Sequence, residues 1–210
     1  MLIPVLALGA LLPAHQAQAW GLMNRDEALT QTDSPSLEKR RQGFARLADV
    51  GTMADIPLLL AALRDDADLI RGVAEQSIWG IWMRANDTAV DHRFQVGMSM
   101  VEQKDYAKAK AMLTEVIAMR PDFAEGWHRR GEVFVLLDDW DSAALDFQKA
   151  LEINPNHFGA LEGLGHCRLN RDDPKAAVEY FRRAIELNPN LWDVYEALER
   201  AQAKLEQNQT

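Results

Sequence analysis

Histidine and carboxylate side chains recur at related positions in the second half of the sequence, and these residue types are suited to binding chemistry. His128 is followed by Glu132 four residues later, and His166 is preceded by Glu162 at the same spacing. Imidazole and carboxylate groups together bind zinc or copper, and an imidazole changes its charge near pH 6. No third histidine is placed with this pair by the spacing, so we expect no metal and no other cofactor. A groove whose charge depends on pH is the favoured hypothesis.

The short motifs that mark common catalytic sites are missing. The sequence contains no glycine-rich phosphate loop, no Gly-x-Ser-x-Gly turn and no His-Glu-x-x-His pair. Acidic turns at 138–141 and 172–173 lack the ligand spacing and the glycine of a calcium loop, and they are typical of helix caps. We therefore expect no catalytic residues and a protein that is not an enzyme.

The elements that must position these side chains follow from an internal repeat of 34 residues. At this spacing the aligned residues are Gly97, Gly131 and Gly165; Pro121, Pro155 and Pro189; Ala109, Ala143 and Ala177; and Leu113, Phe147 and Phe181. Each repeat predicts two amphipathic helices joined by a polar turn, and each proline ends the second helix. Neither helix can bury its apolar face alone, so the repeats are expected to stack into a superhelix.

This pattern resembles the tetratricopeptide repeat (TPR) family. The middle repeat, 124–157, carries nearly the whole motif: Trp127, Gly131, Phe134, Ala143, Phe147, Ala150 and Pro155. The repeats at 90–123 and 158–191 keep fewer of these residues, and Arg168 replaces a usual aromatic in the latter. Residues 192–207 resemble a solvated C-terminal capping helix. The resemblance implies an all-α fold, a right-handed α-α superhelical solenoid of three TPRs plus a capping helix.

The N-terminal residues have the pattern of an export signal. Residues 1–12 carry no charge, and Ala-Gln-Ala at 17–19 fits the small-x-small pattern of signal peptidases, although no lysine or arginine precedes the run. The apolar run is too short for a membrane-spanning helix, which needs roughly 20 residues. Cys167 is the only cysteine, so none follows the signal to carry a lipid anchor. We expect a signal peptide at 1–19, a periplasmic protein and no stable membrane anchor.

A second helical block is predicted at 36–86, after a polar linker at 20–35. Its amphipathic stretches resemble a single HEAT repeat, a helical hairpin. The residues that carry this resemblance are Pro57, Asp65, Ile70, Arg71 and Ala74. The resemblance implies that the block continues the solenoid and docks on the first TPR, with Trp79 and Trp82 filling the junction. An exposed patch of these two tryptophans for a partner is the alternative.

In the TPR family the first helix of each repeat lines a concave groove in which ligands lie, so the 34-residue spacing predicts its lining. We call a row of side chains at residues 34 apart a ladder, and two ladders are expected to line this groove. The first is Phe94, His128, Glu162 and Glu196, and the second, one helical turn further, is Met98, Glu132, His166 and Arg200. A third ladder towards the helix starts is Asp91, Glu125, Gly159 and Asp193. Family members that capture a chaperone's terminal carboxylate carry Lys, Arg and Asn at such positions. This groove is acidic along one edge, so we do not expect that activity.

Charge narrows the class of partner. The net charge is −9 with no basic run, which argues against nucleic acid and against an anionic membrane surface. We expect a non-enzymatic adaptor or scaffold in the bacterial cell envelope, which binds a protein or an extended, neutral to basic peptide in the groove. Two alternatives stay open. One is a self-associating structural protein, a homodimer through Trp192, Tyr195 and the C-terminal helix, and the other is a regulatory subunit of an envelope enzyme complex.

Overall fold

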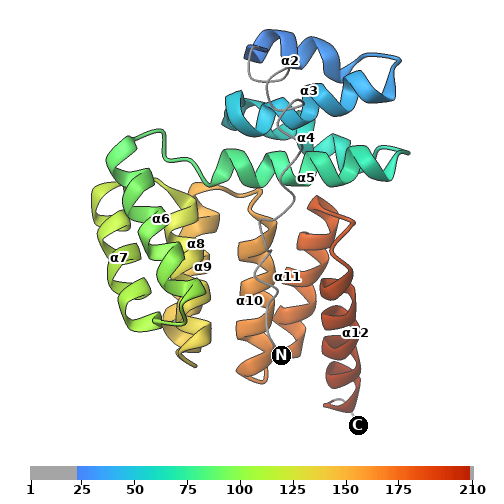
Figure 1. Cartoon of the computed structure of the whole chain (residues 1–210). Helices are drawn as coiled ribbons and strands as arrows, with labels where there is room; N and C mark the ends of the chain where they lie inside the picture. Colours follow the sequence, from blue (N-terminus) through green and yellow to red (C-terminus); the bar gives the residue numbers. More distant parts are fainter. Residues whose placement is uncertain (1–22, 209–210) are drawn as a thin grey trace.

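The computed structural model describes residues 23–208, and all regular elements within this range are helices. In chain order they are α2 (Arg25–Thr32), α3 (Leu37–Val50), a 3₁₀ turn η1 (Met53–Asp55), α4 (Ile56–Ala62), α5 (Asp68–Trp82), α6 (Thr88–Glu102), α7 (Tyr106–Met119), α8 (Ala124–Leu136), α9 (Trp140–Ile153), α10 (Phe158–Asn170), α11 (Pro174–Leu187) and α12 (Trp192–Gln207). Figure 1 shows α6 to α12 as a row of upright helices, with the N-terminal block α2–α5 across one end. The predicted signal peptide lies outside the described residues. None of the described helices is long and apolar enough to cross a membrane.

The solenoid consists of three antiparallel hairpins, α6–α7, α8–α9 and α10–α11, followed by the single helix α12. The hairpin turns are built alike, since Lys104, Asp138 and Asp172 each adopt a φ of 60°. An aspartate follows each of them and caps the next helix. In the middle turn the Asp139 carboxylate accepts a hydrogen bond from the Ser142 N–H at 3.1 Å. The acidic turns therefore serve as helix caps, as predicted.

The core of each hairpin forms where an aromatic ring of the second helix meets a glycine of the first. A Cβ atom at Gly131 would lie 2.8 Å from the Phe147 ring, so only glycine lets α8 approach α9 this closely. Ala143 and Phe147 are fully buried, as are Ala177 and Phe181 one repeat later. The 34-residue alignment thus identified the core positions correctly.

The N-terminal block has a core of its own and includes one more helix than expected. Helix α2 forms inside the stretch that we predicted as a linker at 20–35, so that prediction was wrong for residues 25–32. Most of its side chains are polar, so hydrophobic periodicity could not reveal it. Asn24 and Glu27 cap its start reciprocally, Arg25 Nε donates to the buried Asp55 carboxylate at 2.8 Å, and Ala28 is fully buried. Tertiary contacts therefore stabilise this helix.

The turn between α4 and α5 is held by the residues that suggested a helical hairpin. Pro57 lies in the first turn of α4, where its missing N–H group costs nothing. The Asp65 carboxylate accepts from the Ala67 N–H at 2.9 Å, and Arg71 Nη1 donates to the Asp65 carbonyl oxygen at 2.8 Å. These contacts fix the direction of α5 relative to α4.

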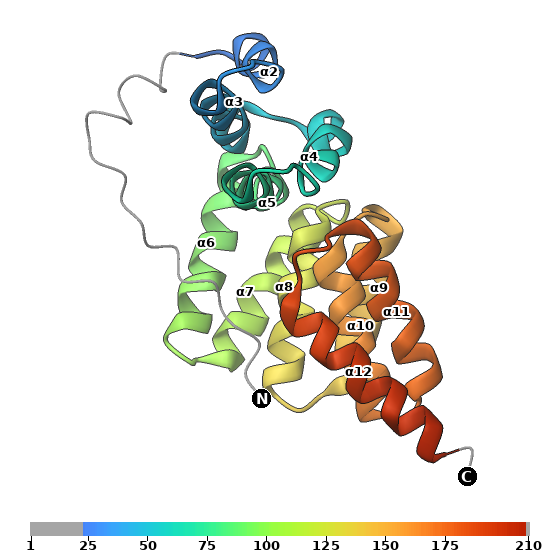
Figure 2. The same cartoon turned by 90° about the vertical axis from the view of Figure 1, so that its right-hand side faces the viewer.

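The block docks on more of the solenoid than its first repeat. Met83 and Ala85, just after α5, join the core of the first repeat, as expected. Helix α5 itself crosses the ends of the later helices (Figures 1 and 2), and Phe158, Leu187 and Leu191 join the core of the block. The prediction of docking on the first TPR alone was therefore incomplete, because periodicity along the chain does not give the direction of α5.

Candidate functional site

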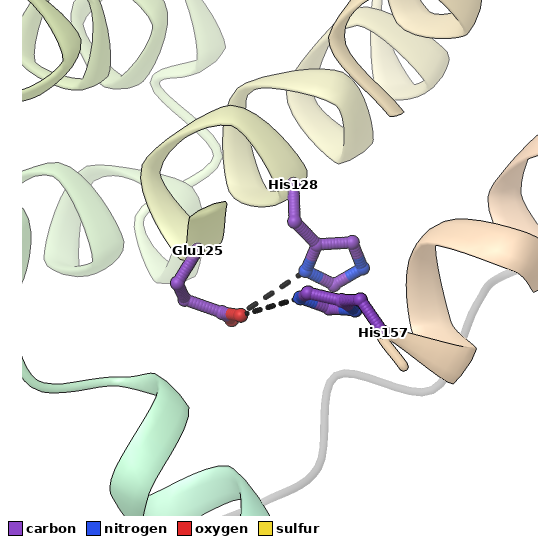
Figure 3. Close-up of side chains that lie close together, drawn as sticks. All are labelled: Glu125, His128 and His157. Atoms are coloured by element: carbon purple, nitrogen blue, oxygen red, sulfur yellow. Dashed lines mark hydrogen bonds and ion pairs between the residues drawn. The ribbon is translucent and has the colours of Figure 1, made fainter. Parts of the chain in front are cut away.

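Three polar side chains meet in the interior between α8 and the start of α10 (Figure 3). Glu125 and His128 are one turn apart on α8, and His157 is the N-cap residue of α10. His157 Nε2 lies 2.9 Å from Glu125 Oε2, and His128 Nδ1 lies 3.4 Å from Glu125 Oε1 without the alignment of a hydrogen bond. Each of the three is at most 2% exposed. Such groups are stable in the interior only if they satisfy one another.

The hydrogen bonds of His157 determine which of its ring nitrogens carries the proton. Nδ1 accepts a hydrogen bond from the Ala160 N–H at 3.2 Å, so the proton lies on Nε2, which donates to Glu125. Nε2 then has no lone pair to offer a metal. Arg129 Nε also donates to Glu125 Oε1, at 2.6 Å, and adds a positive charge where a cation would have to bind. The cluster has the residue types of a metal site, but its bonding is that of a buried ion network.

Burial and neighbouring charges set the protonation of this network. Burial alone would raise the pKa of Glu125, but the positive charge of Arg129, the nearby His128 and the hydrogen bond from His157 outweigh burial and hold that pKa well below its usual range. Burial, with His128 close by, lowers the pKa of His157 to about 4. At neutral pH the network therefore holds an ionised Glu125, an ionised Arg129 and a neutral His157.

Two tryptophans of α5 cover the network. The Trp82 ring stacks on His157 with centroids 4.5 Å apart, and Trp79 lies 5.9 Å from the His128 ring and 5.7 Å from the His157 ring. The Arg129 guanidinium lies over Trp79 at 5.3 Å, a cation–π contact. Trp82 is only 4% exposed. The two rings thus fill the junction, as predicted, and the alternative of an exposed tryptophan patch is wrong.

Helix α5 closes the predicted groove at the starts of α8 and α10. On the third ladder, Glu125 is enclosed in the network, and Gly159 faces Trp79. A Cβ atom at Gly159 would lie 2.9 Å from the Trp79 ring and 3.0 Å from His128 Nε2, so the glycine provides the space that the tryptophan occupies. An extended ligand cannot run across these helix starts while α5 is in place.

Some of the predicted groove residues are not accessible. Phe94 is 3% exposed and contacts the Phe123 ring edge-on at 5.3 Å, which makes it part of the first repeat's core. Met98 packs against the same core, and His128 is 2% exposed beneath Trp79. The apolar beginning of the groove is therefore core, and Phe94 and His128 offer no surface to a partner. The 34-residue spacing identified which side chains lie on the inner face of each helix. It did not predict which of them are buried by neighbouring elements.

The remaining ladder residues share an accessible face of α8, α10 and α12, which we call the ladder face. It consists of Glu132, Glu162, His166, Glu196 and Arg200. Glu132 accepts from Arg129 Nη1 at 3.0 Å, so its charge is largely compensated, and Glu162 lies 3.7 Å from His166. Glu196 and Arg200 are exposed and form no ion pair with another described residue. Glu162 and Glu196 thus carry the negative charge that neither arginine nor lysine neutralises. His128 and His166 are not brought together, since His128 lies with His157.

Sequence reasoning missed His157 and Arg129. The residues one repeat away from His157 are Phe123 and Leu191, so a polar residue stands at a position that is otherwise apolar. That irregularity was the available signal. Arg129 gave no such signal, because its role depends on Trp79 from a distant part of the chain.

Comparisons with known proteins agree with this geometry. Family models described as tetratricopeptide repeat match residues 93–122, 124–157 and 158–191. A TPR repeat-containing protein of Rhizobium etli is 31% identical over 83 residues, which are 40% of this chain and 41% of that protein. The chain thus matches less than half the length of this curated relative.

Solved TPR domains have a similar fold. The Sgt2 TPR domain from Aspergillus fumigatus superposes with a TM-score of 0.56 at 23% identity, over 59% of this chain and 83% of that one. The first TPR domain of Spaghetti, bound to the HSP90 peptide SRMEEVD, gives 0.54 at 20% identity, over 55% and 92%. The helical hairpins, their repeated turns and these matches together show that the chain contains three tetratricopeptide repeats between residues 93 and 191.

Proposed function

We propose that this protein is a non-enzymatic adaptor of the bacterial cell envelope that holds an extended, neutral to basic segment of a partner protein on the ladder face. TPR domains mediate protein–protein interactions, and the Spaghetti domain is bound to a peptide. The observation that best supports the proposal is the pair Glu162 and Glu196, at equivalent positions on α10 and α12. No described lysine or arginine binds either of them.

The charge of the ladder face favours a different ligand from that of the Spaghetti domain. The peptide SRMEEVD in that complex carries three acidic side chains. Glu162 and Glu196 would repel such a peptide, and the buried cation Arg129 already binds Glu125 and Glu132. A basic segment would instead form charge-assisted hydrogen bonds with these two carboxylates, which no described lysine or arginine binds.

The N-terminal block limits where this segment lies. Because Trp79 and Trp82 cover the starts of α8 and α10, the accessible part of the inner face begins about one turn into these helices, and Glu162 lies there. A bound segment would therefore cross α8, α10 and α12 on the side away from α5. Glu132 would be available only in competition with Arg129, so we assign the main charge contacts to Glu162 and Glu196.

Replacing both Glu162 and Glu196 with glutamine is expected to weaken peptide binding roughly tenfold, since two charge-assisted contacts are lost. Peptides of twelve residues would be selected from a random library with the wild-type protein, and affinities measured by calorimetry. Glu179→Gln, which removes an exposed charge on the other helix of the third hairpin, should leave affinity unchanged. Selection of acidic peptides, or equal affinity of all three proteins, would contradict the proposal.

The envelope location is proposed from the sequence of residues 1–19. Fusion of residues 1–24 to alkaline phosphatase, which is active only after export, is expected to give an active enzyme whose mature chain starts at Trp20. Ala19→Asp should block cleavage, because signal peptidase requires a small residue at that position, whereas Gln18→Asp should not. An inactive fusion that keeps Met1 would contradict periplasmic localisation.

A further inference from the structure

The start of α12 exposes two aromatic side chains. Trp192 is 75% exposed and Tyr195 is 37% exposed, and their ring centroids lie 5.9 Å apart. Helix α12 packs on α11, but no described helix follows it, whereas Trp127, the counterpart of Tyr195 in the second repeat, packs against the core of α9 and α10. Tryptophan is mostly buried in proteins, and adjacent exposed rings on a soluble helix commonly mark an interaction surface.

The exposed Trp192 occupies a position at the start of a repeat that is covered in other repeats of the molecule. The counterparts of Trp192 at the 34-residue spacing are Val90, Ala124 and Phe158; Val90 and Phe158 are 2% and 1% exposed, and Ala124 is half-buried. Phe158 is covered by the rings of Trp79 and Trp82. Leu191 still packs against the core of the N-terminal block, and the next residue, Trp192, lies outside that contact. Trp192 therefore extends an established docking surface beyond the point where the block ends.

The surroundings of the aromatic pair are negatively charged. Asp193, Glu196 and Glu199 are exposed and form no ion pair with another described residue. Arg200 is the first basic residue of α12 and lies two turns beyond Trp192. Across the junction, burial raises the pKa of Glu75 on α5, and the charge of Asp193 adds to this effect. A positive charge brought to this place would therefore be stabilised.

We propose that Trp192 and Tyr195, with Asp193, Glu196 and Glu199 around them, form a docking site for an arginine- or lysine-bearing segment of a partner protein. The cation lies over the Trp192 ring, and the carboxylates are its counter-ions. The chain already contains a contact of this kind, since the Arg130 guanidinium lies 5.1 Å from the Trp127 ring centroid.

A second copy of the chain is a poorer occupant. A symmetric contact through α12 would place the carboxylates of one copy against those of the other, in a chain whose net charge is −9. This site adjoins the ladder face at Glu196, but its aromatic pair is separate, so the two can be tested independently.

The probe is a blocked peptide of alternating arginine and glycine, compared with the same peptide carrying uncharged citrulline in place of arginine. We expect the arginine peptide to shift the Trp192 indole N–H resonance, and the citrulline peptide to leave it in place. Trp192→Ala should weaken binding of the arginine peptide about tenfold, the ratio that loss of a desolvated cation–π contact supports. Leu145→Ala, which removes an exposed apolar side chain on α9 (68% exposed), should change nothing.

Each other outcome has a defined meaning. Equal binding by wild type and Trp192→Ala, or by the two peptides, overturns this inference. If Glu162→Gln abolishes binding and Trp192→Ala does not, the ladder face is the site and only the proposed function stands. If Trp192→Ala weakens binding and Glu162→Gln does not, the aromatic site stands and the ladder face is contradicted. A dimer in sedimentation that Trp192→Ala dissociates would show that a second copy covers the face, and would also overturn the inference.

Discussion

Replacing Glu125 with alanine is expected to lower the free energy of unfolding by about 3–5 kcal/mol, the usual cost of removing one partner from a buried ion pair. Glu125 is the acceptor for both Arg129 Nε and His157 Nε2. Trp79 and Trp82 cover the network and hinder its replacement by water. Without Glu125, His157 would keep a buried N–H group with no acceptor, and Arg129 would be left with Glu132 alone.

Glu132→Ala is the matched control for this experiment. Glu132 also binds Arg129, but its side chain is 23% exposed, so its loss should cost less than about 1 kcal/mol. Urea denaturation followed by circular dichroism would give both values, provided that the slope of the transition is unchanged. Equal losses for the two variants would show that burial of Glu125 does not matter, and would contradict this account of the network.

The repeats could be predicted because their boundaries are set by local chemistry. Pro155 and Pro189 each follow a residue with extended backbone, Asn154 and Asn188, which ends α9 and α11. Asp139 and Asp173 cap the second helices from their own side chains. These devices act within a few residues of the chain, so their spacing in the sequence is enough to place the helices.

The docking of the N-terminal block could not be predicted in the same way. It depends on Trp79 occupying the space beside Gly159, a contact between residues far apart in the sequence. Glycine at this point interrupted a ladder of acidic residues, but the sequence alone did not show which ring would fill the gap. The same contact buries His128, which the ladder had placed in the groove.

The exposure of the ladder residues could likewise be predicted at some positions and not at others. Glu196 and Arg200 lie on a terminal helix with few neighbours, and the structure shows them exposed. Phe94 lies between two repeats, and its large apolar side chain is more stable in the core than in a groove. Helical spacing thus predicts the direction in which a side chain points from the helix axis. Its exposure depends on its size, its polarity and the elements that pack nearby.

Acidification is expected to destabilise the protein through His157. Its pKa in the folded protein is about 4, below the ordinary value of 6.5, so folding favours the neutral ring. The stabilisation is complete above pH 6.5 and is lost as the pH falls from 6.5 towards 4, because the unfolded chain then binds the additional proton. The difference between the two pKa values corresponds to a loss of about 3 kcal/mol at most. Glu125 acts in the same direction at lower pH, since its pKa is also lowered by folding.

His157→Asn separates this effect from the titration of the other groups. Asparagine caps helices well and can accept from the Ala160 N–H, but it does not gain a proton in this range. The variant should be less stable at pH 7.5, because the stack on Trp82 and the bond to Glu125 are lost. Between pH 7.5 and 4.5, however, its urea midpoint should fall less than that of the wild type. Parallel curves would mean that His157 is protonated as easily in the folded as in the unfolded chain. In that case the rings of α5 would not exclude charge from the junction. The N-terminal block would then be held by its apolar contacts with Phe158, Leu187 and Leu191 and by hydrogen bonds such as that from Asn190 Nδ2 to the Leu63 carbonyl oxygen.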